Sequence, residues 1–225
     1  MRVLIVTDTH GALRVSDFPE ETYFDLPDAI FILGDVYKND IALTKKLYPT
    51  VKMMGVGGNH DPWDLLTEMG VEDLHERVIK WRGLYIAGFG GSFKYKDSEY
   101  YMMHTQEEAS KAMARMYECD LLLTHDQPCF NPTHIVKKMV PVEKEQNKIA
   151  QMLKIKPGTL YQEIEVEEPI EFDTHTGLVG IAEYIDKNHP KLHLHGHLHD
   201  VGTDWHGATC IRRFYGVEFI EIDLL

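Results

Sequence analysis

Short apolar runs, each followed by a glycine or a polar side chain, recur along the whole chain. They cover residues 2–7, 29–33, 51–56 and 120–124, and a further run extends from Leu192 to His199. Short continuous runs of apolar and β-branched residues bounded by turn residues are typical of buried strands. The pattern therefore predicts strands whose carboxyl ends carry the polar residues.

Segments with helical spacing of apolar residues lie between these runs. They predict helices over residues 40–48, 62–69, 105–117 and 178–188. Further strands are predicted as a hairpin over residues 77–81 and 84–89, and near the C-terminal end over residues 208–214 and 217–224. The glycine-rich residues 88–92 lack the Lys-Ser/Thr of a P-loop, so we interpret them as a flexible turn. Strands alternating with helices favour an α/β fold.

Residues 130–176 interrupt this alternation and differ in charge from the rest. Six lysines and two glutamates lie in residues 131–158, whereas residues 159–173 hold six acidic residues and no basic one. Such a change predicts an insertion with its own hairpin or helix, which serves as a lid or an oligomer contact. A solvated excursion is the alternative. We expect a single domain over residues 1–225 with this insertion.

The amino-acid composition disfavours some classes of binding partner and indicates the cellular compartment. The 36 acidic residues outnumber the 23 basic ones and give a net charge of −13, which disfavours extended nucleic-acid binding and binding to anionic membranes. Three cysteines without paired spacing indicate reduced thiols. We find no signal peptide and no stretch of membrane-spanning length. We therefore expect a cytoplasmic protein, a monomer or a small homo-oligomer.

Side chains that can bind metals follow the apolar runs. They are Asp8, His10, Asp35, Asn59, His125, His197 and His199. Side chains alternate faces in an extended segment, so His197 and His199 would point the same way and share one site. A His-x-His pair alone is usually an ordinary polar pair, but the second pair, Asp8-x-His10, favours a metal. Carboxylates, an amide and imidazoles suit Mn, Fe or Zn, and this number of ligands suits two ions.

Five blocks with these residues occur in a fixed order. They are Asp8-x-His10, Gly34-Asp35, Gly58-Asn59-His60-Asp61, His125 and Gly196-His197-x-His199. In these blocks the sequence resembles the calcineurin-like metallophosphoesterase family, and its small bacterial, archaeal and phage members most. The resemblance implies a metallophosphoesterase-type β-sandwich, in which two mixed, mostly parallel sheets are flanked by helices in four αββα layers.

The resemblance also implies a dinuclear metal centre. One ion would be held by Asp8, His10, Asp35 and His199, and the other by Asp35, Asn59, His125 and His197. The Asp35 carboxylate would bridge two Mn²⁺ ions, with Fe, Zn or Ni as alternatives. Two divalent ions outweigh two carboxylates, so the centre would attract phosphate and supply hydroxide from a bridging water. His60 would protonate or stabilise the leaving oxygen, with Asp61 orienting its ring.

Four glycines near these ligands have two interpretations. Gly11, Gly34, Gly58 and Gly196 would leave room for close approach of a metal, or they are simply turn residues.

Two of the five blocks differ from those of the Ser/Thr phosphatase branch of the superfamily, and the differences bear on the substrate class. The Asp-Arg-Gly of that branch does not follow Asp35, and Asp61 replaces its Glu. An arginine that would clamp a phosphomonoester dianion is not identifiable, so we expect a phosphodiester substrate over a monoester. Two alternatives stay open. One is a metal-dependent nuclease with the lysines of residues 137–156 as its track, and the other is a metal-binding interaction module with low activity.

Overall fold

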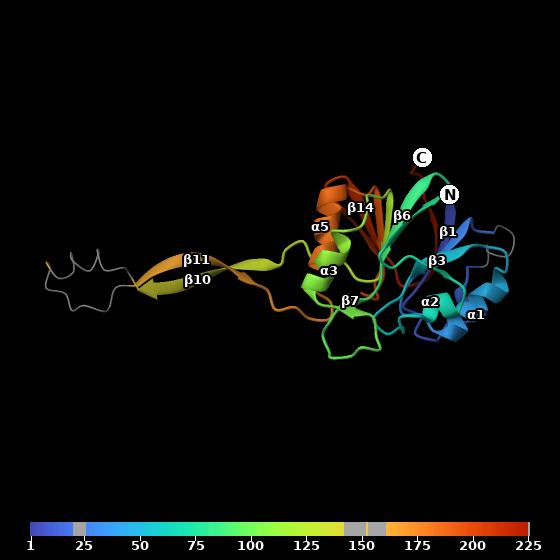
Figure 1. Ribbon diagram of the computed structural model, residues 1–225, viewed down its shortest axis with the longest axis horizontal. Coiled ribbons are helices and arrows are strands. Elements are labelled where there is room, and N and C mark those ends of the chain that lie inside the picture. The colour runs from blue at the N-terminus through green and yellow to red at the C-terminus, as the bar shows by residue number, and fades with distance from the viewer. Residues whose placement is uncertain (20–25, 142–151, 153–160, 225) are drawn as a thin grey trace. The chain divides into compact units, whose positions relative to one another are not determined.

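The computed structural model describes residues 1–19, 26–141, 152 and 161–224 (Figure 1). The chain divides into two compact units. One unit comprises Met1–Phe130 with Phe172–Leu225, and the other is Asn131–Glu171.

The first sheet of the larger unit has the strand order β15-β1-β2-β3-β4. Its strands are β1 (Arg2–Thr7), β2 (Ala29–Leu33), β3 (Met53–Val56), β4 (Glu72–Asp73) and β15 (Gly216–Glu221). Strands β1 to β4 are parallel, and only β15 is antiparallel to its neighbour. The carboxyl ends of β1, β2 and β3 therefore lie side by side.

The second sheet has the order β13-β14-β12-β9-β6-β5. Its strands are β5 (Arg77–Trp81), β6 (Leu84–Phe89), β9 (Leu121–Thr124), β12 (Leu192–His195), β13 (Gly202–His206) and β14 (Thr209–Arg213). The four central strands are parallel, and β5 and β13 are antiparallel at the edges.

Helices cover the outer faces of both sheets. They are α1 (Lys38–Leu47), α2 (Leu65–Glu68), α3 (Gln106–Met113) and α5 (Val179–Asn188). Helices α3 and α5 lie side by side over the second sheet, and α1 and α2 lie over the first (Figure 1). A 3₁₀ turn, Val15–Asp17, and two short parallel strands, β7 (Ser92–Phe93) and β8 (Met103–His104), complete this unit. No helix in the described ranges is long and apolar enough to cross a membrane.

Alternating side chains of the buried strands fill two separate cores. Val3 and Ile5 of β1 pack between the two sheets, whereas Leu4 and Val6 pack beneath the outer helices. Because both faces of the parallel strands are covered, these strands are continuously apolar in sequence. A third core joins the second sheet to α3 and α5. The result is the expected αββα order of layers.

Several predicted boundaries are wrong. The helix predicted over residues 62–69 begins only at Leu65, and the one over residues 105–117 ends at Met113. The glycine-rich residues 88–92 are not a flexible turn, since all five are buried and β6 continues to Phe89. A Cβ on Gly90 would lie 2.5 Å from Met102 Sδ, which explains why this position has no side chain.

Two histidines, the buried His104 and the partly buried His75, hold the Gly90 peptide. The Gly90 N–H donates to His75 Nδ1 at 3.0 Å, and His104 Nε2 donates to the Gly90 carbonyl at 3.1 Å. The two imidazoles stack with centroids 5.4 Å apart, and Phe89 packs against both. Burial lowers the pKa of each histidine to about 4, with His75 contributing further at His104. Both rings are therefore neutral in the folded protein near neutral pH.

We expect His104→Phe to reduce the loss of stability on acidification. The unfolded chain binds a proton at His104 below its usual pKa of about 6.5, whereas in the folded protein His104 is protonated only below its lowered pKa of about 4. Wild type should therefore lose roughly 2 kcal/mol of unfolding free energy between about pH 7 and pH 5 that the variant keeps. Urea unfolding at both pH values measures this difference. The exposed His134→Phe serves as the control, and identical pH dependence for His104→Phe and wild type would contradict the prediction.

The smaller unit contains an antiparallel hairpin. Strand β10 (Thr133–Pro141) pairs with β11 (Tyr161–Pro169) in a register that places Val136 opposite Val166. Residues 130–176 thus contain the hairpin that was one of the predicted alternatives. The role of this segment as a lid or an oligomer contact stays a prediction.

Candidate metal centre

The candidate ligands follow five parallel strands from both sheets. Asp8 and His10 follow β1, and Asp35 follows β2. Asn59 follows β3, His125 follows β9, and the histidines at 197 and 199 follow β12. Ligands in open α/β sheets bind beyond the carboxyl ends of strands. The structure brings six of these residues into two groups whose ligand atoms lie within 4.8 Å of one another, Asp8 with His10 and His199, and Asp35 with His125 and His197.

The first group directs three ligand atoms to one point. His10 Nε2 lies 3.2 Å from His199 Nε2, which lies 3.4 Å from Asp8 Oδ1. Asp8 Oδ2 accepts hydrogen bonds from Thr7 Oγ1 at 2.6 Å and the His197 N–H at 3.0 Å. Asp8 Oδ1 is buried and has no hydrogen-bond partner among the described residues. A buried carboxylate oxygen facing two imidazole nitrogens fits a divalent cation, because ligand atoms about 2 Å from an ion lie at such mutual distances.

Two histidines of the second group have their tautomers set by backbone carbonyls. His125 Nδ1 donates to the Leu33 carbonyl at 2.7 Å, which leaves Nε2 as the ligand atom, 2.9 Å from Asn59 Oδ1. His197 Nε2 donates to the Thr174 carbonyl at 2.7 Å, which leaves Nδ1. Histidines that bind metals usually donate their other ring N–H in this way. Both rings therefore present a lone pair to the centre.

Asp35 lies between the two groups. Its Oδ2 is 3.8 Å from His10 Nε2 and 3.6 Å from His125 Nε2. Its Oδ1 accepts the His60 N–H at 2.8 Å, which fixes the rotation of the carboxylate. One oxygen of Asp35 thus faces ligand atoms of both groups.

Five candidate ligands adopt a left-handed backbone conformation. The φ angles are +52° at Asp8, +47° at His10, +52° at Asp35, +70° at His197 and +53° at His199. Residues other than glycine rarely adopt such angles, and when they do they cluster at functional sites. The expectation that His197 and His199 lie on one extended strand and point the same way is wrong, because β12 ends at His195. The turn that follows sends these two histidines to different groups.

Glycines make room for the ligand side chains. A Cβ on Gly58 would lie 2.2 Å from Asp35 Oδ1, and one on Gly34 would lie 2.5 Å from His125 Nδ1. A Cβ on Gly196 would lie 2.4 Å from Asp8 Oδ2. These three glycines therefore leave room for the ligand side chains of the centre.

In the structure the carboxylate of Asp61 is not hydrogen-bonded to the ring of His60. Its Oδ2 accepts the Gly58 N–H at 2.8 Å, and its Oδ1 has no hydrogen-bond partner in the described part of the chain. Burial, with the nearby charge of Asp35, raises the pKa of Asp61 to about 7. The ring of His60 instead lies against the rings of His10 and Tyr101, with centroids 5.4 and 6.3 Å away. Asp61 thus supports the loop that carries Asn59.

The charges of the centre favour a cation. Burial alone would lower the pKa of His125, but the carboxylates of Asp35 and Asp8 outweigh it and raise this pKa. Burial lowers the pKa of His197 to about 3, so this ring is neutral. The carboxylates thus stabilise positive charge at the centre, and a divalent cation would supply that charge.

Sequence patterns missed several residues that support the centre. Asp40 accepts hydrogen bonds from Thr9 Oγ1 and the Gly11 N–H, both at 2.7 Å, and so holds the loop around His10. Tyr95 contacts the amide of Asn59, whose Nδ2 donates to the Tyr95 hydroxyl at 3.3 Å. No spacing or motif marks these residues, because their roles depend on how loops fold against each other.

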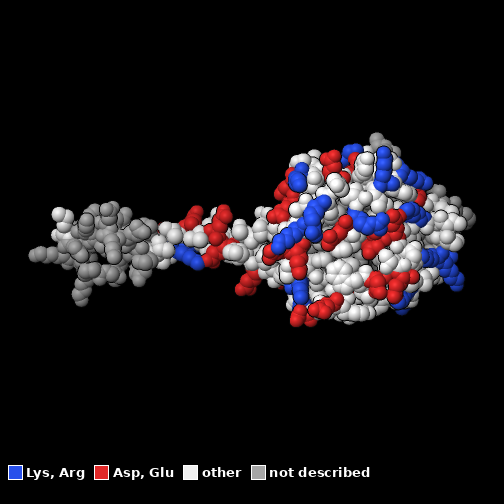
Figure 2. Space-filling view, viewed as in Figure 1, with Lys and Arg blue, Asp and Glu red and all other residues white. Residues whose placement is uncertain are grey.

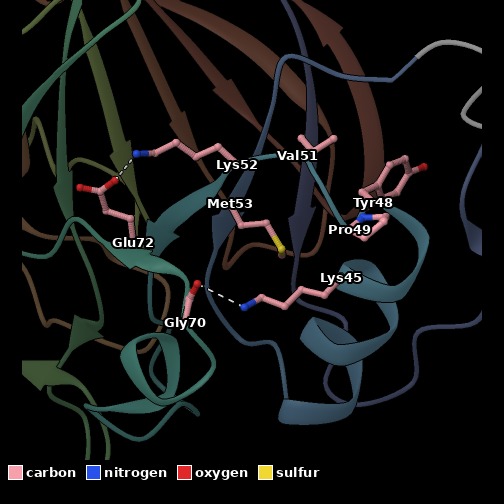
Figure 3. Close-up of a pocket in the computed structure, with 8 residues that line it drawn as sticks. All are labelled: Lys45, Tyr48, Pro49, Val51, Lys52, Met53, Gly70 and Glu72. Atoms are coloured by element: carbon pink, nitrogen blue, oxygen red, sulfur yellow. Dashed lines mark hydrogen bonds and ion pairs between the residues drawn. The ribbon is translucent and has the colours of Figure 1, made fainter.

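A hollow of about 450 Å³ lies away from these ligands, beside α1 and β3 (Figure 3). Lys45 Nζ donates to the Gly70 carbonyl at 3.2 Å, and Lys52 Nζ pairs with Glu72 at 2.5 Å (Figure 3). Both ammonium groups are thus neutralised or hydrogen-bonded within the protein, and the lining contains no candidate ligand. The metal groups remain the candidate functional site.

Solved structures share the fold at low sequence identity. Protein TT1561 of Thermus thermophilus has a TM-score of 0.57 at 15% identity, over 96% of this chain and 89% of that one. Phosphopantetheinyl hydrolase (PptH) from Mycobacterium tuberculosis has a TM-score of 0.53 at 14% identity, over 95% and 89%. A putative 5′-nucleotidase from Staphylococcus aureus has a TM-score of 0.52 at 11% identity, over 97% of this chain but 50% of that one. These similarities support the predicted α/β sandwich. No curated protein matches the chain.

Sequence comparison with protein families gives the assignment that the fold and the ligand groups suggest. The family model for the calcineurin-like phosphoesterase superfamily domain matches residues 1–214, and all five sequence blocks lie within this match. The predicted family and fold class are thus confirmed. The chain belongs to the calcineurin-like phosphoesterase superfamily, a group of metal-dependent phosphoester hydrolases.

Proposed function

We propose that the protein uses two divalent ions to hydrolyse phosphoesters and cleaves phosphodiesters in preference to phosphomonoesters. The position of Asp35 carries this proposal. Its Oδ2 lies within 4 Å of an imidazole nitrogen of each ligand group, at 3.8 and 3.6 Å, as a bridging carboxylate requires. Membership of a superfamily of metal-dependent hydrolases supports the same reaction class.

The ligand sets follow from the two groups. We assign Asp8, His10, Asp35 and His199 to one ion, and Asp35, Asn59, His125 and His197 to the other. Mixed oxygen and imidazole ligation suits Mn²⁺, with Fe, Zn or Ni as alternatives. Such ions, when bound, polarise phosphoryl oxygens and acidify water.

His60 is proposed to give a proton to the leaving oxygen of the substrate. Its backbone N–H is anchored on Asp35, and its half-buried ring lies beside His10 at the edge of the centre. The backbone of His60 is therefore held by the same carboxylate that we assign to both ions. Asp61, for which we expected a role in orienting this ring, acts instead on the Gly58 N–H.

The charges near His60 support a substrate with a single negative charge. The Lys96 ammonium lies 4.7 Å from the centroid of the Tyr101 ring, next to His60. The Lys38 ammonium is paired with Glu68 at 2.5 Å. A hollow of about 370 Å³ lies beside His60, and no arginine of the described ranges lines it. A phosphodiester monoanion needs less positive charge than a phosphomonoester dianion, so we favour the diester.

The described strands of the hairpin do not support the nuclease alternative. β10 carries Lys137 and Lys138, which pair with Glu163 and Glu168 of β11. Across both strands two lysines face four glutamates, and acidic side chains gather there (Figure 2). The remaining lysines of the predicted track, at positions 144 to 156, lie outside the described residues. A phosphate backbone would be repelled by this acidic surface.

A metal-replacement assay tests the proposal. Protein stripped of metal and refilled with Mn²⁺ should hydrolyse both bis-p-nitrophenyl phosphate and p-nitrophenyl phosphate, with the higher kcat/KM on the diester. The stripped protein should hydrolyse neither. Elemental analysis should give two Mn per chain. Two bound ions without turnover on either ester would contradict the proposal and favour the interaction module.

A further inference from the structure

A hollow of about 370 Å³ borders the candidate metal centre on the side of His60. Its walls include Tyr37, Asn39, His60, Pro62, Tyr100 and Tyr101. We call it the tyrosine hollow. Its volume lies within the range of about 300–1,000 Å³ that is typical of small-molecule pockets. Because His60 lines both the hollow and the edge of the centre, a substrate phosphorus at the metals would place one ester substituent in the hollow.

Aromatic rings connect the hollow to the metal ligands. Tyr101 lies 6.3 Å from His60, and Tyr100 packs edge-on against Tyr101 at 5.0 Å, measured between ring centroids. Tyr37, which also lines the hollow, lies 6.5 Å from the ligand His10, measured between ring centroids. Tyr37 and Tyr100 nevertheless stay 42% and 63% exposed, so their rings are available to a ligand.

The position of Tyr37 is fixed by the metal-binding loop. A Cβ on Gly11 would lie 2.7 Å from Tyr37 Cδ2, so only glycine admits the ring beside the loop that carries His10. Asp40 accepts the N–H groups of both Gly11 and Tyr37, at 2.7 and 3.1 Å. Asn39 Nδ2 donates to the Gly11 carbonyl at 2.8 Å. Tyr37 thus keeps a defined position relative to His10.

The chemistry of the walls selects a planar heteroaromatic group. Tyrosine rings offer faces for stacking, and their hydroxyl groups can donate to and accept from polar ring edges. An alkyl chain would use none of these polar groups. A second phosphate would have to compete with Glu68 for the Lys38 ammonium, and the Lys96 ammonium already lies 4.7 Å from the centroid of the Tyr101 ring. Nucleobases combine a flat π-face with hydrogen-bonding edges and stack on aromatic side chains in this way.

We propose that the tyrosine hollow is a nucleobase subsite and that the substrates are phosphoesters of a nucleoside. The base would lie among Tyr37, Tyr100 and Tyr101, and the ester phosphate at the metal ligands. This inference rests on the proposed function of the metal centre. It concerns a single nucleoside unit, which is compatible with a net charge of −13 that disfavours long nucleic acids.

Calorimetric titration of the Mn²⁺-loaded protein tests the subsite without requiring turnover. Adenosine 5′-monophosphate should bind at least about ten-fold more tightly than glycerol 3-phosphate, because only the nucleotide stacks a base. Tyr37→Leu and Tyr100→Leu should each weaken nucleotide binding about ten-fold and leave inorganic phosphate binding within about two-fold. Tyr37→Phe keeps the ring and should retain most of the affinity. Tyr117→Leu is the matched control, because Tyr117 is 82% exposed and lies outside the hollow.

The outcomes separate the subsite from the proposed function. Equal affinities for the nucleotide and glycerol 3-phosphate would overturn the subsite, as would equal weakening of nucleotide and inorganic phosphate in both leucine variants. Hydrolysis of bis-p-nitrophenyl phosphate without nucleotide preference would leave the proposed function standing and remove the subsite. Tyrosine-dependent nucleotide binding without hydrolysis of any ester would support the subsite and contradict the proposed function.

Discussion

Replacing Asp35 by asparagine is expected to lower kcat/KM for bis-p-nitrophenyl phosphate by at least about 10³-fold in Mn²⁺-loaded protein, or about 4 kcal/mol of transition-state stabilisation. Asparagine keeps the shape of the side chain and removes the negative charge that lies between His10 and His125. An amide oxygen is a weak bridging ligand, so the bound Mn should also fall below two per chain. Steady-state kinetics and elemental analysis measure the two effects.

Asp73→Asn is the matched control for Asp35→Asn. Asp73 is a partly buried carboxylate that accepts the His75 N–H at 2.9 Å, and it belongs to neither ligand group. Its variant should keep two Mn per chain and wild-type turnover. Equal activity of Asp35→Asn and Asp73→Asn would show that Asp35 does not bridge two ions.

Replacing His60 by asparagine should separate metal binding from proton transfer. The ring contributes no atom to either ligand group, so the variant should keep two Mn per chain. General acid catalysis typically contributes 10²–10⁴-fold, so we expect a loss of about 10³-fold on a diester with an alkoxide leaving group. With p-nitrophenolate, which leaves without a proton, the loss should be under about ten-fold. Parallel assays on both esters measure this contrast.

His206→Asn is the control for His60→Asn. His206 is a half-exposed histidine whose Nε2 lies 2.6 Å from Asp186 Oδ1, away from the ligand groups. Its variant should retain activity on both esters. If His60→Asn lost equal activity on good and poor leaving groups, His60 would be positioning the substrate rather than donating a proton.

Local patterns predicted the parts of the structure that depend on neighbours in sequence. The strands ending before Asp8, Asp35 and His125 are buried on both faces, and their apolar runs therefore stand out. Strand β13, Gly202–His206, was missed because it lies at a sheet edge with its residues partly or fully exposed. Edge strands of this kind lack the apolar run by which buried strands are recognised.

The contacts between loops could not be predicted from spacing. Asp61 adjoins His60 in sequence, yet its carboxylate turns to the Gly58 N–H, and only the folded loop determines this choice. Likewise, His197 and His199 were expected to point the same way from one strand, but the left-handed turn after β12 directs them to different ligand groups. Tyr37 and Tyr100 are far apart in sequence and belong to no motif, so their common hollow appears only in three dimensions.

The left-handed backbone conformation of five candidate ligands lowers the stability of the fold at positions that activity requires. Each of the five residues holds a backbone conformation that costs on the order of 1 kcal/mol and that glycine or asparagine adopts more easily. A laboratory selection for thermostable variants, run with chelator and without an activity screen, would therefore favour asparagine at these five positions, because its amide oxygen can still accept the backbone N–H groups that Asp8 and Asp35 hold. Selection for catalysis would instead keep the aspartates and histidines at these positions, although replacing them would raise stability. Engineering of a more robust enzyme from this chain should leave these five positions fixed and stabilise the outer helices instead.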